Sequence, residues 1–356
     1  MRILISSPHD IWYDFALYMT DKSTLKIKFS LYNVENLFLL FDHPIPENFE
    51  QLSEPDWQKL SSSVYYNKPL RKCLEIAKLI LKNDPDIVML CEVGGLESLK
   101  NFSKFFLDSS YSCVLIEGNS DRNIDIGYLI KKNQPYFFDI ISNKNRPLNF
   151  LYPHELVSQK HGFKIKSPSQ TFSRDCAELR LFKSNRSKPF LIILLTHLKS
   201  RLDPEKIDPG GSERRAAELK MALVIYKELE KEFPTCPILF CGDLNGYAGV
   251  PTPDSEFLPL YQETDLQDVL EVAGLTIDNR YTFYQIKNGG KVEGKQIDYC
   301  FLPKKAWPNL IKQESFVYRY TNHLDQQINI PNSIEAKGIL PSDHYPLFFT
   351  LENIII

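Results

Sequence analysis

Apolar segments of this chain end repeatedly at an acidic, amide or imidazole side chain. An alternating, strand-like segment at 26–32 is followed at once by Asn33. Three further apolar runs end in the same way, at Glu92, His197 and Asp243. Because an unpaired charge is costly inside a core strand, we expect these side chains to share one polar rim of a packed sheet. The pattern predicts an active site at that rim.

The same polar set continues in the second half of the chain. Asn245 follows Asp243 by two positions, and Asp343 and His344 lead directly into a strand-like segment at 345–351. Asp298 completes this set of carboxylate, amide and imidazole groups.

Two segments have helical spacing of their apolar residues. The first runs from Leu70 to Leu81 and is stopped by Asn83-Asp84-Pro85. The second begins at Ser212, which is a candidate N-cap, and continues to Phe233. The stretch 42–68 is expected to be a long loop with one helical turn near Trp57.

Strands are expected to follow one another without an intervening helix around 112–141 and 172–197. This argues against a purely parallel sheet and favours an α/β (α+β) fold, a four-layer sandwich of two packed mixed sheets flanked by helices. We predict one catalytic domain, residues 25–356, preceded by an N-terminal extension of unknown role, residues 1–24.

Composition narrows the function classes. The chain has 356 residues, 43% of them hydrophobic and 24% charged, which is typical of a globular protein. A formal charge of −3 argues against a protein that coats nucleic acid, but a nuclease can bind phosphate through a few local cations and a metal. Seven cysteines without CxxC spacing suggest neither a zinc site nor a complete disulfide framework, and Cys91, Cys241 and Cys300 are expected to be buried thiols.

No signal peptide or membrane span is recognisable in the sequence. Stable membrane insertion is therefore not expected. The default location is the cytoplasm, and secretion without a signal peptide stays open.

The chemistry of the polar set points to a metal-assisted reaction. Oxygen donors of this kind suit Mg²⁺, with Mn²⁺ as a second option, rather than structural zinc. No G-x-S-x-G elbow and no P-loop occur in the chain. Attack of water on a phosphate ester is the reaction that these groups favour.

Seven segments together resemble the endonuclease/exonuclease/phosphatase superfamily of metal-dependent phosphoesterases. They occur in the family's order: YNVENLF at 32–38, DPDIVMLCEV at 84–93, IDIGYL at 124–129, THLKSR at 196–201, GDLNG at 242–246, QIDY at 296–299 and SDHYPL at 342–347. Each one alone is weak, but seven in order are specific.

The resemblance implies a metal site. Glu92 is similar to the family's principal metal ligand, with Asn33 beside it on the metal or the phosphate. Asp343 would lie near the metal as a second carboxylate.

The resemblance also implies groups that act on the phosphate. Asp243 is similar to the residue that orients or deprotonates the attacking water, and Asn245 would hold a phosphate oxygen. His344 would contact the scissile phosphate while Asp298 holds its imidazole. His197 resembles a histidine that meets a phosphate oxygen or the leaving group.

Arg174 and Lys199 are further candidates for substrate binding. After His197, a basic rim that faces the substrate could be formed by Lys199, Arg201, Arg214 and Arg215, although a solvated surface is an equal alternative for the three arginines. Relatives often carry Arg-Gly where this chain has Arg122 and Asn123, so no role is assigned to Arg122.

Taken singly, these residues have structural interpretations: Asn33 could cap a strand end, Asp298 could pair with Lys295, and the histidines could be hydrogen-bonded core residues. The leading hypothesis is a Mg²⁺-dependent phosphodiesterase, with nucleic acid slightly preferred as substrate. A phosphoinositide phosphatase or a sphingomyelinase-like enzyme acting on a phospholipid headgroup is the alternative, and a catalytically dead binding module ranks lower. Oligomeric state and the roles of the 42–68 and 200–211 loops stay open.

Overall fold

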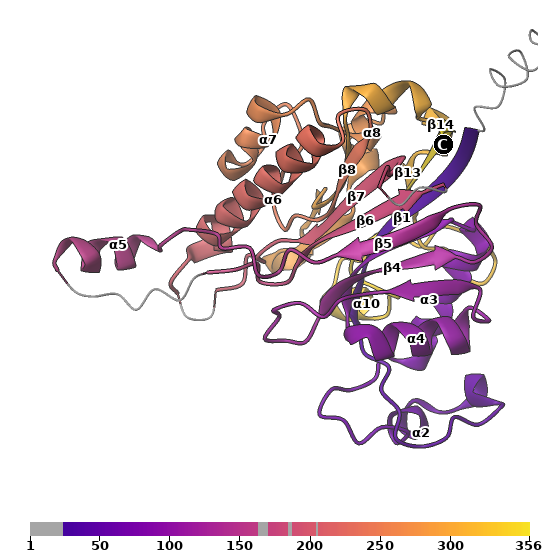
Figure 1. Cartoon of the computed structure of the whole chain (residues 1–356). Helices are drawn as coiled ribbons and strands as arrows, with labels where there is room; N and C mark the ends of the chain where they lie inside the picture. Colours follow the sequence, from indigo (N-terminus) through magenta and orange to yellow (C-terminus); the bar gives the residue numbers. More distant parts are fainter. Residues whose placement is uncertain (1–23, 163–169, 184–186, 204–205) are drawn as a thin grey trace, which may run out of the picture.

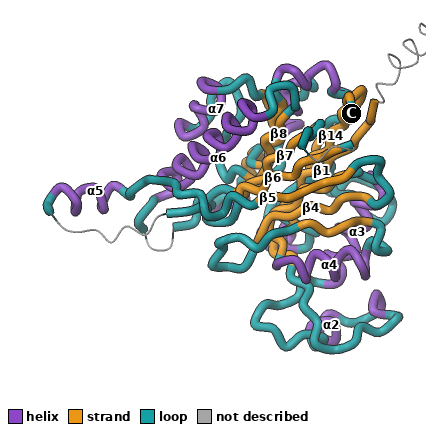
Figure 2. Tube along the Cα trace, viewed as in Figure 1, coloured by secondary structure: helices purple, strands orange, loops and turns teal. Residues whose placement is uncertain are grey.

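Two mixed β-sheets packed face to face form the centre of the molecule, with helices on their outer faces (Figures 1 and 2). The computed structural model describes residues 24–162, 170–183, 187–203 and 206–356. The first sheet contains, in spatial order, β13 (Phe316–Val317), β14 (Leu347–Ile355), β1 (Thr24–Leu37), β2 (Ile87–Val93), β4 (Asp125–Lys131) and β3 (Tyr111–Val114). The second contains β5 (Phe137–Ile141), β6 (Cys176–Phe182), β7 (Leu191–His197), β8 (Ile238–Asp243), β12 (Asp298–Leu302) and β9 (Gln267–Asp268). The predicted fold class is confirmed.

Helices and one hairpin complete the fold. The α-helices are α2 (Glu54–Gln58), α3 (Leu70–Asn83), α4 (Gly95–Phe106), α5 (Pro153–Lys160), α6 (Ser212–Glu232), α7 (Leu258–Glu263), α8 (Val269–Val272), α9 (Ile277–Arg280) and α10 (Ile334–Gly338). The 3₁₀ turns are η1 (Phe49–Gln51), η2 (Pro209–Gly211), η3 (Ser255–Phe257), η4 (Asn288–Gly290), η5 (Lys304–Asn309) and η6 (Lys312–Glu314). The hairpin pairs β10 (Phe283–Ile286) with β11 (Val292–Lys295).

The core follows from the period of two in the strands. In β7, Leu191, Ile193 and Leu195 belong to the cluster between the sheets, while Ile192 and Leu194 belong to the cluster under α6. Side chains alternate across a strand, so a strand buried on both faces is apolar throughout.

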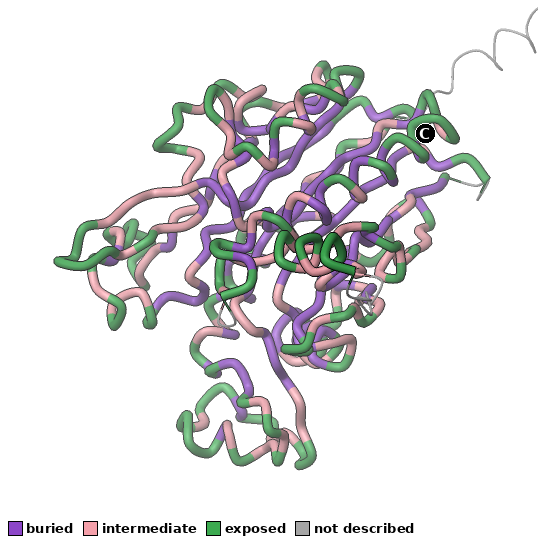
Figure 3. The backbone as a smooth tube through the Cα atoms, turned by 90° about the vertical axis from the view of Figure 1, so that its left-hand side faces the viewer, coloured by how far each residue is buried: buried purple, intermediate pink, exposed green. Residues whose placement is uncertain are grey.

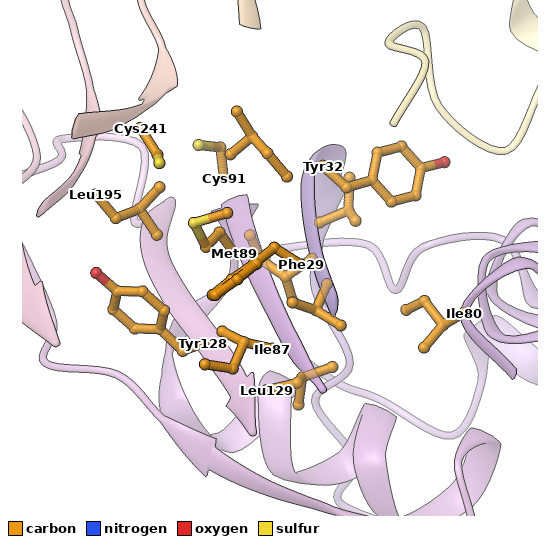
Figure 4. Packing of buried hydrophobic residues seen from close by; sticks show 14 of the residues in the cluster. Phe29, Tyr32, Ile80, Ile87, Met89, Cys91, Tyr128, Leu129, Leu195 and Cys241 are labelled. Atoms are coloured by element: carbon orange, nitrogen blue, oxygen red, sulfur yellow. The ribbon is translucent and has the colours of Figure 1, made fainter. Parts of the chain in front are cut away.

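Figure 4 shows the contact between the sheets, where Leu195 and Cys241 of the second sheet approach Met89 and Cys91 of the first. Burial is continuous along the central strands, and exposure concentrates in the loops (Figure 3). The thiols of Cys91, Cys241 and Cys300 are buried and unpaired, as predicted.

Strand direction gathers the polar strand ends at one edge. Strands β1 and β2 are parallel, as are β7 and β8, so their carboxyl ends lie at the same edge of each sheet. Strand β12 runs antiparallel to β8, and β14 runs antiparallel to β1. The amino ends of β12 and β14 therefore lie at this edge too. The sheets pack with β1 and β2 against β7, β8 and β12, which brings the two edges together into one rim.

The two predicted helices are present, with one correction. Helix α3 ends at Asn83, and Asp84 follows in the left-handed conformation with φ 48°. The prediction of Ser212 as N-cap of α6 was wrong, because Ser212 is already helical and Gly211 precedes it. The carboxylate of Asp208 instead accepts from the backbone amides of residues 213 and 214, at 3.1 and 3.0 Å. Gly210 and Gly211 both have positive φ, which turns the chain back so that Asp208 reaches these amides.

The predicted N-terminal extension lies outside the described residues, apart from Thr24, with which β1 begins. Within the described ranges, no helix combines the length and the apolar character needed to cross a membrane.

Candidate active site

Asp243 lies at the centre of the rim. It is the last residue of β8, and its neighbours across the sheet are His197 on β7 and Asp298 on β12. Oδ2 of Asp243 lies 3.4 Å from Nε2 of His197 and 4.0 Å from Nε2 of His344. From the facing sheet, Nδ2 of Asn33 donates a hydrogen bond of 2.9 Å to Oδ2 of Asp243. The expectation that strand ends share one rim is met at these residues.

The side chain of Asp243 is buried, which disfavours its ionised form. Burial, followed by the nearby carboxylate of Asp298, raises the pKa of Asp243 to about 7. Its other oxygen accepts from the backbone amide of Asn245 at 2.9 Å. A carboxyl group that titrates near neutral pH can take a proton from a bound water molecule.

His344 and Asp298 form a hydrogen-bonded pair. Nδ1 of His344 lies 2.8 Å from Oδ2 of Asp298, and both side chains are buried. Burial alone would lower the pKa of His344, but the carboxylates of Asp298, Asp343 and Asp243 outweigh it and raise that pKa well above its usual value. The imidazole is therefore charged at neutral pH and presents Nε2–H towards Asp243. The structural alternative for Asp298, a pair with Lys295, is wrong, because Lys295 contacts Glu293 and Gln285.

His197 has the opposite character. Burial, with the nearby guanidinium of Arg174 and the charged His344, lowers the pKa of His197 well below its usual value. Its Nδ1 atom is buried without a hydrogen-bond partner in the described part of the chain. His197 is thus a neutral imidazole beside a charged one.

The side chains of Asn33 and Glu92 are each held by one of two consecutive backbone amides, those of Glu35 and Asn36. The amide of Glu35 donates to Oδ1 of Asn33 at 3.0 Å, and the amide of Asn36 donates to Oε2 of Glu92 at 3.1 Å. Glu35 and Asn36 both have positive φ, at 49° and 54°, where β1 bulges away from β2. Strained backbone of this kind is common where side chains must be held for function.

Asp343 lies at the side of the cluster. Its carboxylate is 3.8 Å from Nε2 of His344 and 3.4 Å from Nζ of Lys337. Burial opposes its ionisation, but these two cations hold the pKa of Asp343 below its usual range. Asp343 is therefore an ionised neighbour of His344.

Arg174 and Asn245 meet at one backbone carbonyl beside the cluster. Nδ2 of Asn245 and Nη1 of Arg174 both donate to the carbonyl of Leu198, at 3.1 and 3.5 Å. The Arg174 residue is only 6% exposed, and among the described residues its Nε has no hydrogen-bond partner. Burial lowers the pKa of Arg174, and the carboxylates of Glu218, Glu92 and Asp243 partly oppose that shift. A buried guanidinium whose Nε–H has no partner among the residues that the structure describes, although Glu218 lies near it, can donate to a bound anion.

The structure does not bring Lys199 into the cluster. Its Nζ donates to the carbonyl oxygens of Ser200 and Leu202, and its backbone amide donates to Glu218. Lys199 lies on the wall of the neighbouring cleft, which it shares with Arg174.

Sequence reasoning discounted Arg122, which the structure places beside the site. Nη2 of Arg122 donates to Oδ1 of Asn36 at 2.8 Å, and Arg122 also acts electrostatically on His197. Asn123, the departure from the family's glycine, has φ 50°. Asparagine adopts this conformation more readily than most residues other than glycine. The backbone turn at residue 123 therefore forms with asparagine in place of glycine. This replacement gives no reason to exclude Arg122 from the site.

Two hydroxyl groups that support the cluster were also missed. Oγ of Ser342 donates to the carbonyl of Asn33 at 2.7 Å and accepts from the amide of His344 at 3.1 Å. Oγ1 of Thr282 accepts from the amide of Asp298 at 3.1 Å. Ser342 stands inside the SDH motif and could have been found there, whereas Thr282 belongs to no recognised motif.

The donors at the rim fit a hard divalent cation. One atom each of Asp243, Asp298 and His344 lies within 4.8 Å of the others, close enough to surround an ion. A charged His344 whose Nδ1 is engaged by Asp298 would nevertheless repel a cation. Glu92 and Asn33 offer a carboxylate and an amide oxygen, which are the donor types that Mg²⁺ prefers. The donor types of Glu92 and Asn33 fit the predicted metal, and their role as its ligands stays a prediction.

Solved structures with the same fold were found. TDP2 from Caenorhabditis elegans is 16% identical over 92% of this chain and 98% of its own, with a TM-score of 0.53. TDP2 from D. rerio, in complex with a single-stranded DNA product, is 16% identical over 91% and 98%, with a TM-score of 0.52. An endonuclease/exonuclease/phosphatase family protein from Bacteroides thetaiotaomicron is 13% identical over 93% and 99%, with a TM-score of 0.51.

These likenesses confirm the endonuclease/exonuclease/phosphatase fold that the motifs implied. No family model matches the chain, and no curated protein matches it by sequence.

Proposed function

We propose that this chain is a Mg²⁺-dependent phosphodiesterase that hydrolyses a phosphodiester by in-line attack of water, with nucleic acid the preferred substrate. The observation that carries the proposal is the pairing of a charged His344, held by Asp298, with an Asp243 that titrates near neutral pH. Hydrolysis of a phosphoester needs a general base for the attacking water and positive charge near the phosphate. Asp243 and the imidazolium of His344 offer these two groups side by side in a buried site.

Glu92 would hold the metal, with Asn33 and Asp343 beside it; Mn²⁺ is a second option. When bound, the ion would supply positive charge to a phosphate oxygen.

The other residues of the site would transfer a proton or contact the phosphate. Asp243 would take a proton from the attacking water, and Asn245 and Arg174 would hold phosphate oxygens. His344 would face the phosphate as negative charge builds on it. His197, as a neutral imidazole, would meet a phosphate oxygen or the leaving group.

Nucleic acid is preferred because one structure with this fold, TDP2 from D. rerio, holds a single-stranded DNA product. A phospholipid headgroup remains the second candidate, since the same residues would act on any phosphodiester. A catalytically dead binding module is disfavoured, because the complete set of charged and metal-ligating groups is retained.

Nicking of supercoiled plasmid by the pure protein with Mg²⁺ tests the substrate. The expected result is nicking that disappears both with EDTA and in His344→Ala. In parallel, vesicles containing sphingomyelin or phosphoinositides are assayed for headgroup release. An untouched plasmid together with headgroup release would move the proposal to phospholipids, and inactivity on all substrates would contradict it.

A further inference from the structure

A cleft of about 600 Å³ opens next to Arg174. We call it the arm cleft, because one wall comes from the arm that carries α5, which projects away from the sheets (Figure 1). The remaining walls come from the 119–122 turn, the loop after β7 and the start of α6. The cleft lies outside the cluster around Asp243, but Arg174 belongs to both.

Basic and acidic residues line this cleft in equal numbers, four of each. Arg122, Arg174, Lys199 and Arg214 line it. Its acids are Asp121, Glu155, Asp203 and Asp208, and the last three accept hydrogen bonds from nearby backbone amides. The ammonium of Lys199 and the guanidinium of Arg122 are bonded to neutral oxygens. The cleft therefore offers an anion individual cationic groups rather than a net positive charge.

Arg174 is the residue of this cleft that points to a bound anion. It is almost completely buried, its Nε lacks a partner among the described residues, and Glu218 lies near it without a hydrogen bond to the guanidinium. Holding a buried charge in this way costs free energy, which an anion bound in the cleft would offset.

Two aromatic rings also line the cleft. The rings of Tyr152 and His154 lie 5.8 Å apart with an angle of 15° between their planes, and Phe150 packs edge-on against Tyr152 at 4.9 Å. His154 is exposed and Tyr152 is half-buried. An aromatic surface next to cations is the combination that binds single-stranded nucleic acid, because every base has a face that can stack.

We propose that the arm cleft binds the nucleotide next to the scissile phosphate of a single-stranded nucleic acid, with its phosphate at Arg122 and Arg174 and its base against Tyr152 and His154. The proposal rests on the proposed function and names the form of its substrate. A base within a duplex is covered on both faces by its neighbours, so only an unpaired base can lie on these rings. An inositol phosphate would satisfy the cations, but its saturated ring gains little from the aromatic side chains.

Binding is tested by fluorescence anisotropy of a labelled 12-nucleotide oligothymidylate in EDTA, so that no cleavage occurs. We expect Tyr152→Ala and His154→Ala each to weaken binding about fivefold or more, and Arg122→Ala about tenfold. Tyr66→Ala is the matched control, since Tyr66 is exposed and lies outside this cleft. Melting temperatures check folding, and the exposed His154 provides a variant in which folding is not at risk.

Three outcomes would overturn the inference. The first is affinity of the aromatic variants within twofold of the wild type. The second is equal affinity for a duplex of the same length, and the third is tighter binding of inositol 1,4,5-trisphosphate than of the oligonucleotide.

Kinetics separates this inference from the proposed function. The ratio of kcat/KM for the oligonucleotide to that for bis(4-nitrophenyl) phosphate should fall about fivefold in Tyr152→Ala. If the wild type hydrolyses both substrates and the ratio is unchanged in Tyr152→Ala, the proposed role of the arm cleft is wrong, while the proposed phosphodiesterase activity is supported. If the wild type hydrolyses neither with Mg²⁺, the proposed function itself fails.

Discussion

The charge on His344 depends on one carboxylate, that of Asp298, bonded to its Nδ1 atom. Asp298→Asn keeps the size of the side chain but removes the charge that favours imidazolium. We expect kcat to fall about 10- to 100-fold, the effect typical of a residue that orients a functional group. The alkaline limb of the pH–rate profile should also move to lower pH, because the histidine loses its proton more easily.

Rate measurements between pH 5 and 10 check this expectation. Asp325→Asn is the matched control, because Asp325 is a surface residue paired with Lys82. Unchanged kcat and pH profile in Asp298→Asn would show that His344 does not act as a charged group.

Asp268 predicts a pH dependence of stability away from the active site. It is completely buried on β9, accepts a hydrogen bond from Gln296 at 3.0 Å, and burial raises its pKa to about 7. A folded-state pKa above the unfolded value means that the stabilising contribution is present at low pH and is lost as pH rises through about 7.

Between pH 5.5 and 8.5 the free energy of unfolding of the wild type should therefore fall by about 2 kcal/mol more than that of Asp268→Asn. Urea denaturation at both pH values measures the difference. Parallel behaviour of the two proteins would show that Asp268 does not take up a proton on folding.

At the scale of elements, the position of Asp243 depends on close contact between β7 and β8. Gly242 has φ 152°, and a Cβ atom there would lie 1.9 Å from the carbonyl oxygen of Thr196. Gly242→Ala should lower the free energy of unfolding by about 3 kcal/mol or more, since backbone atoms must move.

Gly338→Ala is the control for that substitution, because a Cβ atom at Gly338 meets nothing within 4 Å. Thermal unfolding of the two variants makes the comparison. A stable Gly242→Ala with full activity would contradict this account of how β8 places Asp243.

Elements with a buried face were predictable from the sequence, and those without one were not. Strand β7 and helices α3 and α6 could be read from their apolar spacing, because each buries residues against a core. Helix α5 buries no residue, so no periodicity revealed it. The cap of α6 was missed because it depends on Asp208 folding back through a glycine turn, which spacing alone does not show.

The grouping of the motif residues at one rim was predictable, but Asn33 and Glu92 were expected just after their strands and instead lie inside β1 and β2. Asn33, Asp243, Asp298 and His344 meet as expected, because the strand directions bring their ends to one rim. The contribution of Arg122 depends on backbone conformation at the next residue, which is not evident from residue type.

For the whole molecule, a metal bound between the two sheets should stabilise the fold. Glu92 lies near the end of β2 in the first sheet, and Asn33 of the same sheet donates a hydrogen bond to Asp243 of the second. Saturating Mg²⁺ at about 100 times its Kd should add about 2.7 kcal/mol. The corresponding rise in Tm, reversed by EDTA, should be lost in Glu92→Gln. An equal rise in the wild type and Glu92→Gln would place the metal elsewhere.

The central claim, metal-dependent hydrolysis of a phosphodiester at this rim, is tested most directly with bis(4-nitrophenyl) phosphate, which carries no base and no lipid. We predict release of nitrophenol by the wild type with Mg²⁺, none with EDTA, and a rate at least about 100-fold lower in His344→Ala. Hydrolysis that continues undiminished in His344→Ala, or no hydrolysis by a folded wild type at any Mg²⁺ concentration, would contradict the account.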